Sequence, residues 1–326
     1  MAVLGTGSAG LRHLAALQML PGVLPVAVPR RRERRAELKA MGYATAATLA
    51  EAIKDLNVSH CIVASDTSRH VYDGLAALAS GLPTLVEKPL SVDAAGGRQL
   101  WLQAQRDGVG LRVACVMRFS QSLQAFRSWL PKIGEVASVR IECQSYLPDW
   151  RPNRPYRDSY SARPAEGGVL RDLIHEIDYA GWLFGWPAQL HARLDHSGRL
   201  GIDVEEAADL LWRTSTGAAV SMRLDYVTKP SRRRMTACGA GGVLEWDALR
   251  NTVTLQRADG SAEDCTEPQS REAMFAAQAD AFIEAVSGGS DDDRLATGLE
   301  GVRALALCDA ARRADASRRE EPVEYL

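Results

Sequence analysis

The sequence predicts an α/β domain with a doubly wound parallel sheet, followed by an α+β domain built on a large, mostly antiparallel sheet. Three observations support this fold class. A glycine loop follows the first apolar segment, short strands and helices alternate over the first 120 residues, and strands dominate the remainder. The length of 326 residues suits two cores. We expect a first domain over residues 1–118 and a second over 119–326, with a C-terminal helix that packs back on the first.

In the first domain, short apolar segments alternate with helical patterns. The predicted strands are Ala2–Leu4, Val23–Val28, Val58–Ala64, Thr84–Val86 and Arg112–Val116. The predicted helices are Leu11–Leu20, Arg31–Met41, His70–Ala79 and Asp93–Arg106, the last with Asp93 as a plausible cap. Strands with few polar residues, separated by helices, indicate a parallel sheet covered on both faces.

In the second domain, strands follow one another with turns between them. The predicted strands are Glu135–Tyr146, Gln189–Leu194, Asp209–Arg213, Ala218–Asp225, Arg234–Cys238, Val243–Trp246 and Thr252–Gln256. The predicted helices are Gly168–Leu183, Glu272–Val286 and Leu299–Arg312.

Composition excludes several classes of protein. The chain is 46% hydrophobic and 25% charged with a net charge of −2, so nothing global favours nucleic acid or an acidic membrane. No apolar run reaches the roughly 20 residues that span a bilayer. The six cysteines are too scattered for a zinc knuckle or a redox pair. We expect a cytoplasmic protein without a signal peptide, a metal, a membrane partner or a nucleic-acid partner.

The glycine loop predicts a Rossmann-type dinucleotide site. It reads Gly5-Thr6-Gly7-Ser8-Ala9-Gly10 and lies between a strand and a helix, which is the context that makes the motif informative. The first glycine permits a tight turn, the second lets amides approach a diphosphate, and the third allows close helix–strand packing. The alternative is a glycine turn without a ligand.

The end of the second strand predicts NADP in preference to NAD. An acid that accepts hydrogen bonds from the adenosine ribose is expected there, but the chain has Pro29 followed by Arg30 and Arg31. Guanidinium groups grip a 2′-phosphate well. The alternative is that these arginines are the solvated start of a helix.

Tyr146–Gly168 is a long segment with four prolines and no periodicity, yet it is rich in aromatic and arginine residues. Such segments in compact domains are usually functional loops. A lid that grips an anionic substrate is one interpretation, and packing of the loop against the sheet is the other.

Three further motifs carry a family resemblance: Glu87-Lys88-Pro89 after a strand, Arg118-Phe119, and the run from Gly167 through Asp172 and His175 to Asp178. With the glycine loop, they make the chain similar to the Gfo/Idh/MocA family of oxidoreductases, which includes glucose–fructose oxidoreductase and inositol dehydrogenase. Tyr146–Trp150, Tyr156-Arg157 and Tyr160-Ser161 resemble a branch associated with surface-polysaccharide and nonulosonic-sugar gene clusters.

The resemblance implies an open-faced sheet in the second domain and an active site between the domains. It implies that Lys88, Asp172 and His175 are catalytic. Beyond the glycine loop, it implies cofactor contacts from Arg30, Arg31, Ser65, Thr67, His70, Glu87 and Lys88. It implies substrate contacts from Lys88, Arg118, Trp150, Arg151, Tyr156, Arg157, Tyr160, Asp172 and His175.

The chemistry of these residues agrees with oxidation of an alcohol. A histidine exchanges protons near neutral pH, and an aspartate three residues earlier shares its face of a helix. A lysine can stabilise charge on the reacting oxygen. Many members of the family space the aspartate and histidine by four residues, so Asp172 and Asp178 could exchange roles. Many also have an asparagine where this chain has Val116.

The sequence therefore predicts hydride transfer between NADP or NAD and a hydroxyl or keto carbon of a sugar, sugar acid, nucleotide sugar or polyol. Two alternatives remain: a non-catalytic NADP-binding regulator and an imine- or bilin-type reductase. A sheet face without its own helices usually packs against another subunit, which predicts a homodimer or homotetramer.

Overall fold

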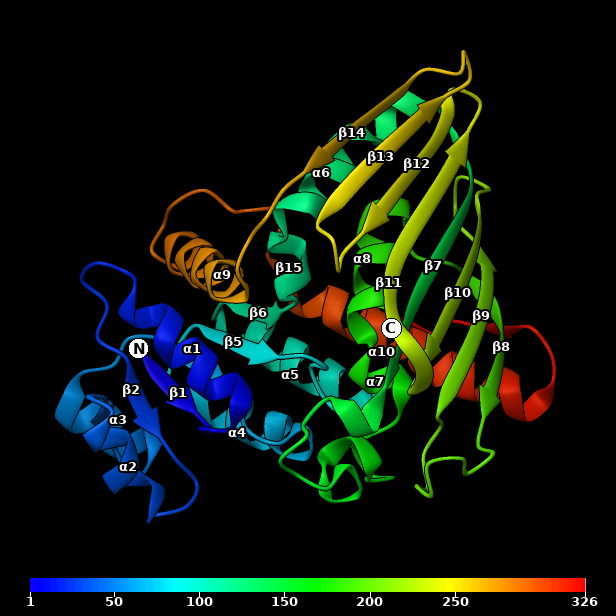
Figure 1. The fold of residues 1–326 in the computed structure, drawn as a ribbon. Helices are drawn as coiled ribbons and strands as arrows, with labels where there is room; N and C mark the ends of the chain where they lie inside the picture. The colour runs from blue at the N-terminus through cyan, green and yellow to red at the C-terminus, as the bar shows by residue number, and fades with distance from the viewer. Residues whose placement is uncertain (326) are drawn as a thin grey trace. The chain divides into compact units, whose positions relative to one another are not determined.

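The computed structural model describes residues 1–325, and the chain forms two compact units (Figure 1). The first unit comprises Met1–Phe119 and Ser270–Val302, and the second comprises Ser120–Gln269 and the chain from Arg303 onward. Residues 270–302 are expected in the second domain from the sequence, but they belong to the first unit. The reason is that helix α9 (Arg271–Val286) packs on helix α1 (Ser8–Gln18) and contributes buried side chains to that core.

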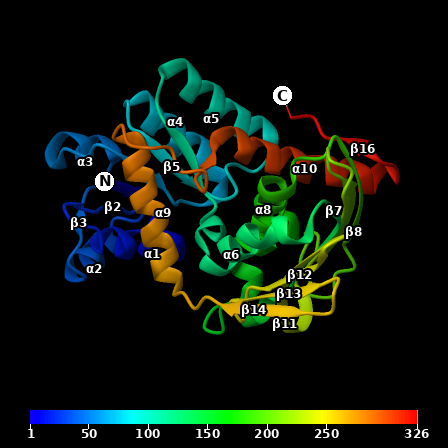
Figure 2. The same ribbon diagram turned by 90° about the horizontal axis from the view of Figure 1, so that it is seen from above.

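The first unit is built on the predicted doubly wound sheet, whose described strands have the order β15-β6-β5-β4-β1-β2-β3. All neighbours are parallel except β15 with β6. The strands are β1 (Ala2–Leu4), β2 (Val26–Val28), β3 (Ala44–Thr45), β4 (Cys61–Val63), β5 (Thr84–Glu87), β6 (Leu111–Ala114) and β15 (Ala296–Thr297). The remaining helices are α2 (Arg34–Ala40), α3 (Leu49–Leu56), α4 (His70–Ala79) and α5 (Ala94–Asp107). Figure 2 shows α1 and α9 on one side of the sheet and α4 and α5 on the other.

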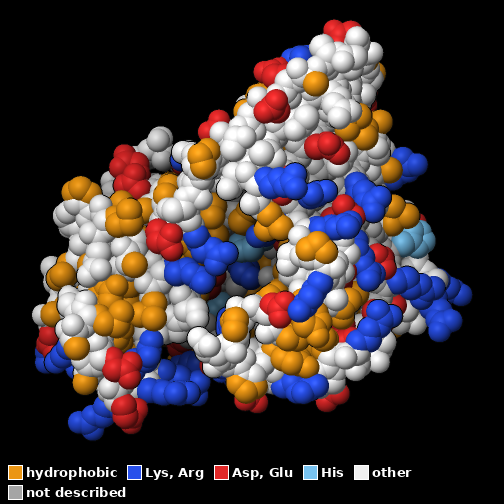
Figure 3. Space-filling view, viewed as in Figure 1, with side chains coloured by type: hydrophobic (Ala, Val, Ile, Leu, Met, Phe, Trp, Pro, Cys, Tyr) orange, Lys and Arg blue, Asp and Glu red, His pale blue; other side chains and the backbone are white. Residues whose placement is uncertain are grey.

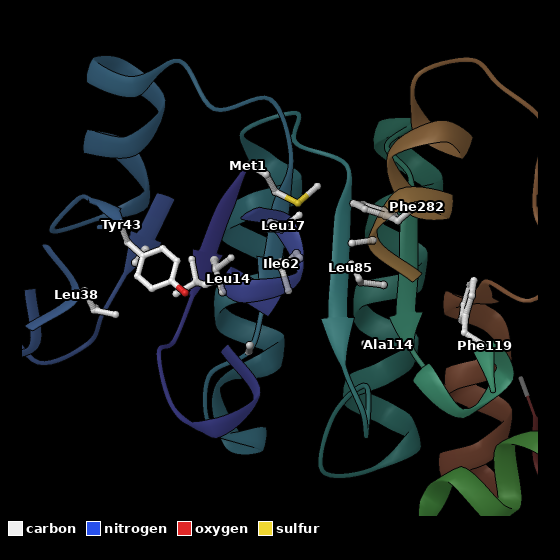
Figure 4. Close-up of a cluster of buried hydrophobic side chains, with 14 of the residues drawn as sticks. Met1, Leu14, Leu17, Leu38, Tyr43, Ile62, Leu85, Ala114, Phe119 and Phe282 are labelled. Carbon is white, nitrogen blue, oxygen red and sulfur yellow. The ribbon is translucent and has the colours of Figure 1, made fainter. Parts of the chain in front are cut away.

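One buried cluster fixes α1 and α9 on the sheet (Figure 4). Ile62 and Leu85 come from the strands, Leu14 and Leu17 from α1, and Phe282 from α9. Each of these side chains is essentially inaccessible to solvent, and burial of one such side chain contributes roughly 1.5–3 kcal/mol. This packing determines where the glycine loop and the end of β5 lie within the unit.

The second unit carries the predicted, mostly antiparallel sheet. The order of its described strands is β14-β13-β12-β11-β7-β10-β9-β8-β16, and only β7 and β10 pair in parallel. The strands are β7 (Val136–Tyr146), β8 (Gln189–Asp195), β9 (Ala207–Arg213), β10 (Ala219–Asp225), β11 (Val227–Gly239), β12 (Gly242–Asp247), β13 (Thr252–Arg257), β14 (Ala262–Thr266) and β16 (Glu321–Pro322). Helices α6 (Gln121–Trp129), α7 (Val169–Asp172) and α8 (Ile174–Phe184) belong to this unit, and the unit boundary falls inside α10 (Gly298–Ser317).

The predicted helix Gly168–Leu183 is wrong in one respect, because the structure divides it into α7 and α8. Leu173, between them, leaves the helical region with φ −95° and ψ 28°. Side chains on both sides of this break are tied to the sheet region, Asp172 by Tyr226 and Glu176 by Arg233. Asp172 therefore ends one helix and His175 lies in the first turn of the next.

Residues alternate between the two faces of this sheet. On β9, Leu210 and Trp212 are buried, whereas Asp209 and Leu211 are exposed. Helices α6 and α7 contact strands of the sheet. Figure 3 shows Lys and Arg side chains along the part of the surface that strands β11 to β8 form in Figure 1. In residues 1–325, no helix has both the length and the apolar character needed to cross a membrane.

Candidate active site

The glycine loop lies at the carboxyl end of β1 and begins α1. A Cβ atom on Gly5, whose φ is +88°, would lie 2.5 Å from the Ala64 carbonyl oxygen, and one on Gly10 would lie 2.0 Å from the Gly5 carbonyl oxygen. A Cβ on Gly7 would meet nothing within 4 Å. No side chain caps α1 at Gly7, so its first amides can donate to a ligand. Gly5 and Gly10 are tightly packed against the backbone, whereas the space beside Gly7 is free for a diphosphate. These residues therefore fit a dinucleotide.

Two of the predicted arginines at the end of β2 are exposed. Arg30 lies 3.6 Å from the Asp66 carboxylate in a largely solvated pair, and Arg31 is exposed. Arg34, which the sequence alone does not single out, donates from Nε to the Thr6 carbonyl oxygen at 3.1 Å. This bond holds a third guanidinium beside the glycine loop. Its sequence signal was the same run of arginines.

The loops after β4 and β5 are joined by His70. Its Nδ1 lies 2.8 Å from the Pro89 carbonyl oxygen and its Nε2 lies 3.1 Å from the Ser65 carbonyl oxygen. Burial lowers the pKa of His70, although the two carbonyl oxygens oppose this change. Thr67 is buried in the short helix Thr67–Arg69, which belongs to the loop after β4. His70 thus brings the segments of Ser65 and Lys88 together, and its ring is engaged by the backbone on both sides.

Glu87 is buried at the end of β5 and holds the start of the Lys88 loop. Its Oε1 lies 2.8 Å from Nε2 of His13, and its Oε2 accepts from the Lys88 amide at 3.1 Å. Burial raises the pKa of Glu87, but the hydrogen bond from His13 and the charges of His13 and Lys88 outweigh burial. The pKa is therefore lowered and the carboxylate is ionised at neutral pH. His13 also packs edge-on against Phe275 of α9, with ring centroids 4.9 Å apart.

Arg118 is placed differently from the substrate contact that the resemblance implies. It lies in a short helix after β6, its side chain is inaccessible to solvent, and its guanidinium lies 2.9 Å from Glu300. An inaccessible guanidinium in an ion pair stabilises the fold around it. A substrate contact is therefore not proposed for Arg118.

In the second unit, Asp172 is bound by a residue that the sequence analysis missed. The hydroxyl of Tyr226 donates to Oδ2 of Asp172 at 2.7 Å, and both side chains are buried. Burial, followed by the neighbouring Asp172 carboxylate, raises the pKa of Tyr226 well above its ordinary value. The tyrosine hydroxyl therefore keeps its proton. No local pattern marks Tyr226, because it is far from Asp172 in the sequence.

His175 is half-buried in the first turn of α8, and the adjacent Glu176 is fully buried. Glu176 Oε1 lies 2.7 Å from Nε of Arg233 on β11, and the Tyr179 hydroxyl donates to it at 3.4 Å. Burial lowers the pKa of Arg233, but the charge of Glu176 outweighs burial and the pKa is raised. This ion pair fixes α8 against the sheet. Asp178, the alternative partner for His175, is also buried on α8.

The segment Tyr146–Gly168 is folded against the sheet rather than loose. Trp150 donates to the Ser145 hydroxyl at 2.9 Å. The Tyr156 hydroxyl and the Arg157 guanidinium both donate to the Leu200 carbonyl oxygen, at 2.8 and 3.1 Å. Arg151 lies over the ring of Tyr160, 5.4 Å from its centroid. Tyr156 and Arg157 thus anchor the segment at Leu200, whereas Arg151 lies over an aromatic ring within the segment.

Models of one protein family match both parts of the chain. Residues 1–115 match the oxidoreductase family with an NAD-binding Rossmann fold, and residues 131–245 match the GFO/IDH/MocA C-terminal domain. The 1,5-anhydro-D-fructose reductase of Ensifer adhaerens is 25% identical, covering 84% of this chain and 82% of that protein. The UDP-N-acetylglucosamine 3-dehydrogenase of Acidithiobacillus ferrooxidans is 25% identical, covering 93% of each.

The fold is also that of a solved dehydrogenase. A structure of levoglucosan dehydrogenase in complex with NADH superposes with a TM-score of 0.88 at 18% identity, covering 100% of this chain and 99% of that one. The family model identifies an oxidoreductase with an NAD-binding Rossmann fold, and the glycine loop and the order of the strands in the first sheet agree with that fold. The chain belongs to the Gfo/Idh/MocA family, as the sequence motifs indicate.

Proposed function

We propose that this enzyme transfers a hydride between a nicotinamide dinucleotide and a hydroxyl or keto carbon of a sugar, sugar acid, nucleotide sugar or polyol. The proposal rests on the residues that lie at the carboxyl ends of the strands of the first sheet. The glycine loop follows β1, and Lys88 follows β5 in a loop held by Glu87 and His70. In parallel α/β sheets, ligands bind at the carboxyl ends of the strands.

Each catalytic residue has a role that its chemistry permits. The nicotinamide, when bound, accepts or supplies the hydride. Lys88 hydrogen-bonds the reacting oxygen and stabilises its developing charge. His175 takes the hydroxyl proton during oxidation and returns it during reduction. Asp172, whose carboxylate is held by Tyr226, orients or assists His175.

A substrate panel with nicotinamide absorbance as the readout tests this proposal. We expect turnover with at least one sugar-like substrate, and a loss of at least a hundredfold in kcat for Lys88→Ala and His175→Ala. His191→Ala, an exposed histidine on β8, is the control. Dinucleotide binding without turnover on any substrate would instead favour a regulator, and undiminished turnover in Lys88→Ala would contradict the proposed role.

The proposed preference for NADP rests on Arg30, Arg31 and Arg34. Pro29 supplies no acceptor for a ribose hydroxyl, and Arg34 is bonded to the glycine loop itself. Arginine binds phosphate in a bidentate fashion. We expect tighter binding of NADPH than of NADH, and Arg30→Ala with Arg31→Ala should remove most of the difference. Arg213→Ala, an exposed arginine of the other unit, is the control. Tighter binding of NADH by the unaltered enzyme contradicts the preference.

The segment Tyr146–Gly168 is proposed to contact an anionic substrate through Trp150, Arg151 and Tyr160. Arg151 stacks on Tyr160, whereas Arg157 is committed to Leu200. Arg151→Ala should raise KM for carboxylated or nucleotide-linked sugars while leaving KM for neutral sugars unchanged. Arg157→Ala should lower the free energy of unfolding, because it removes the hydrogen bond that anchors the loop at Leu200. Equal effects of Arg151→Ala on charged and neutral substrates contradict this role.

We also propose a homo-oligomer, formed through the sheet face that carries Leu211, half of whose surface is exposed (51%). Leu211→Glu should shift the mass in solution towards the monomer, and a monomeric unaltered protein contradicts the proposal.

A cytoplasmic location is proposed because all six cysteines are free thiols. Cell fractionation tests it.

A further inference from the structure

Tyr226 lies between β10 and β11 and connects two parts of the second unit. Its side chain is inaccessible to solvent, and its hydroxyl reaches Asp172 at the end of α7. A hydroxyl has one hydrogen to donate, and an aspartate carboxylate is an acceptor. The 2.7 Å bond therefore fixes the rotation of the Asp172 side chain.

The same residue also holds the beginning of the segment Tyr146–Gly168. The Leu147 amide donates to the Tyr226 carbonyl oxygen at 2.9 Å. The Trp150 ring packs edge-on against the Tyr226 ring, with centroids 5.4 Å apart and planes at 89°. Such aromatic pairs contribute about 0.5–1.5 kcal/mol beyond burial.

A second anchor of that segment also leads to Tyr226. Tyr156 and Arg157 donate to the Leu200 carbonyl oxygen, and the Leu200 amide donates to Glu206 Oε1 at 2.7 Å. The Tyr226 amide in turn donates to the Glu206 carbonyl oxygen at 2.9 Å. The start of the loop thus contacts Tyr226 directly, and its middle is connected to the Tyr226 backbone through Leu200 and Glu206, while the Tyr226 hydroxyl binds Asp172.

We infer that Tyr226 is a positioning residue, which couples the seating of the segment Tyr146–Gly168 to the orientation of the Asp172 carboxylate. This inference rests on the proposed function, because it acts through Asp172. The hydroxyl and the ring have separable tasks. The hydroxyl orients Asp172, and the ring with its backbone seats the loop.

Tyr226→Phe tests the hydroxyl. It keeps the ring and should lower kcat by tenfold to about a hundredfold, the usual effect of misplacing a catalytic group, with KM nearly unchanged. A general loosening of the unit would raise KM as well, so an effect on kcat alone marks a loss of orientation at Asp172. Tyr179→Phe is the matched control, because it removes a hydroxyl that also donates to a buried carboxylate of this unit. It should change neither kcat nor KM.

Tyr226→Ala tests the ring, with limited trypsin digestion as a readout that is independent of activity. Arg151, Arg154 and Arg163 each precede a proline, so cleavage within the loop is confined to the bond after Arg157. Cleavage there should be faster in Tyr226→Ala than in the unaltered protein, and unchanged in Tyr226→Phe.

A double-mutant cycle with Asp172→Asn separates the possible outcomes. Tyr226→Phe should cost less than twofold in kcat when Asp172 is already replaced, because the coupling acts through that residue. Two fully additive losses, or a raised KM with unchanged kcat in Tyr226→Phe, would overturn the inference and leave the proposed function standing. Full activity of Asp172→Asn alone would overturn the proposed role of Asp172, and this inference with it.

Discussion

Nε2 of His13 lies 2.8 Å from Oε1 of Glu87, and both side chains are buried in the first unit. His13 belongs to the helix that follows the glycine loop, and Glu87 ends β5 immediately before Lys88. One hydrogen bond therefore links the cofactor helix to the loop of the proposed catalytic lysine.

Replacing His13 by alanine should cost about 2–4 kcal/mol of unfolding free energy, because the ionised Glu87 would lose a buried partner. Urea denaturation measures this loss. His196→Ala, at an exposed position, should change stability by less than about 0.5 kcal/mol. Equal stabilities of the two variants would show that the pair contributes nothing.

Two glycines of the same loop should respond differently to alanine. In Gly7→Ala the new methyl group meets nothing and φ of −73° is ordinary, so unfolding free energy should change by less than about 0.5 kcal/mol. The affinity for the dinucleotide should fall at least tenfold, because the methyl group occupies the approach of the diphosphate. Gly10→Ala places a methyl group against the Gly5 carbonyl oxygen and should cost about 2–4 kcal/mol. Calorimetry with each cofactor and urea denaturation distinguish the two effects.

Stability should fall as the pH is lowered from 7 towards 5. Burial lowers the pKa of His70 in the folded state, and burial with the charge of the N-terminal amine lowers that of His60. Below about pH 6.5 these two histidines bind protons in the unfolded chain at pH values where they are still neutral in the folded chain. Lowering the pH therefore favours unfolding. At the fully buried His70 this removes up to about 1.4 kcal/mol per pH unit, and the partly exposed His60 contributes less. Glu87, whose pKa is lowered, acts only at more acidic pH, where its protonation removes further stability.

The variant His70→Gln should flatten this pH dependence, whereas His196→Gln should preserve it. Thermal unfolding at several pH values measures the slope. A His70→Gln variant with an unchanged slope would exclude His70 as its source.

Gly168 and Gly217 both have a positive φ, of +96° and +93°, but only Gly168 is crowded. A Cβ at Gly168 would lie 2.5 Å from the Glu205 carboxylate, which Arg312 binds at 2.9 Å. Gly217→Ala should cost about 1–2 kcal/mol from the backbone alone. Gly168→Ala should cost about 2 kcal/mol more and should also lower kcat, because Gly168 precedes α7 and Asp172. Similar losses in both variants would mean that Glu205 moves aside freely.

Much of the fold could be predicted because its signals are local. Apolar strands and the glycine loop mark the first sheet, and Asp93 caps α5 as expected, accepting from the Gly96 amide. Helix α3 was missed although its signal is present. Thr48 and Glu51 have the Thr-x-x-Glu spacing of a capping box. Thr48 accepts from the Glu51 amide, and Glu51 accepts from the amide of Ala47, one residue before the cap.

The candidate site was less predictable, because its contacts join distant residues. His13 with Glu87 and Asp172 with Tyr226 are each brought together by strand order, which no local pattern encodes. The division of the predicted helix at Leu173 has the same origin, since neighbouring side chains are bound by residues of the sheet region. Arg118 follows a motif, but the motif does not reveal its burial against Glu300.

The parallel pairing of β7 with β10 has a consequence for the newly made chain. β7 is the first strand of its sheet to be synthesised and lies between β11 and β10, both of which come later. Ser138 cannot meet Ala219 until the chain between them, with α7, α8 and the loop that binds Tyr226, has left the ribosome. Until then both edges of an eleven-residue strand are open to other chains. The helices that carry the proposed catalytic aspartate and histidine are thus completed while the sheet still lacks its central pairing, so association of β7 with other chains competes with folding during this interval.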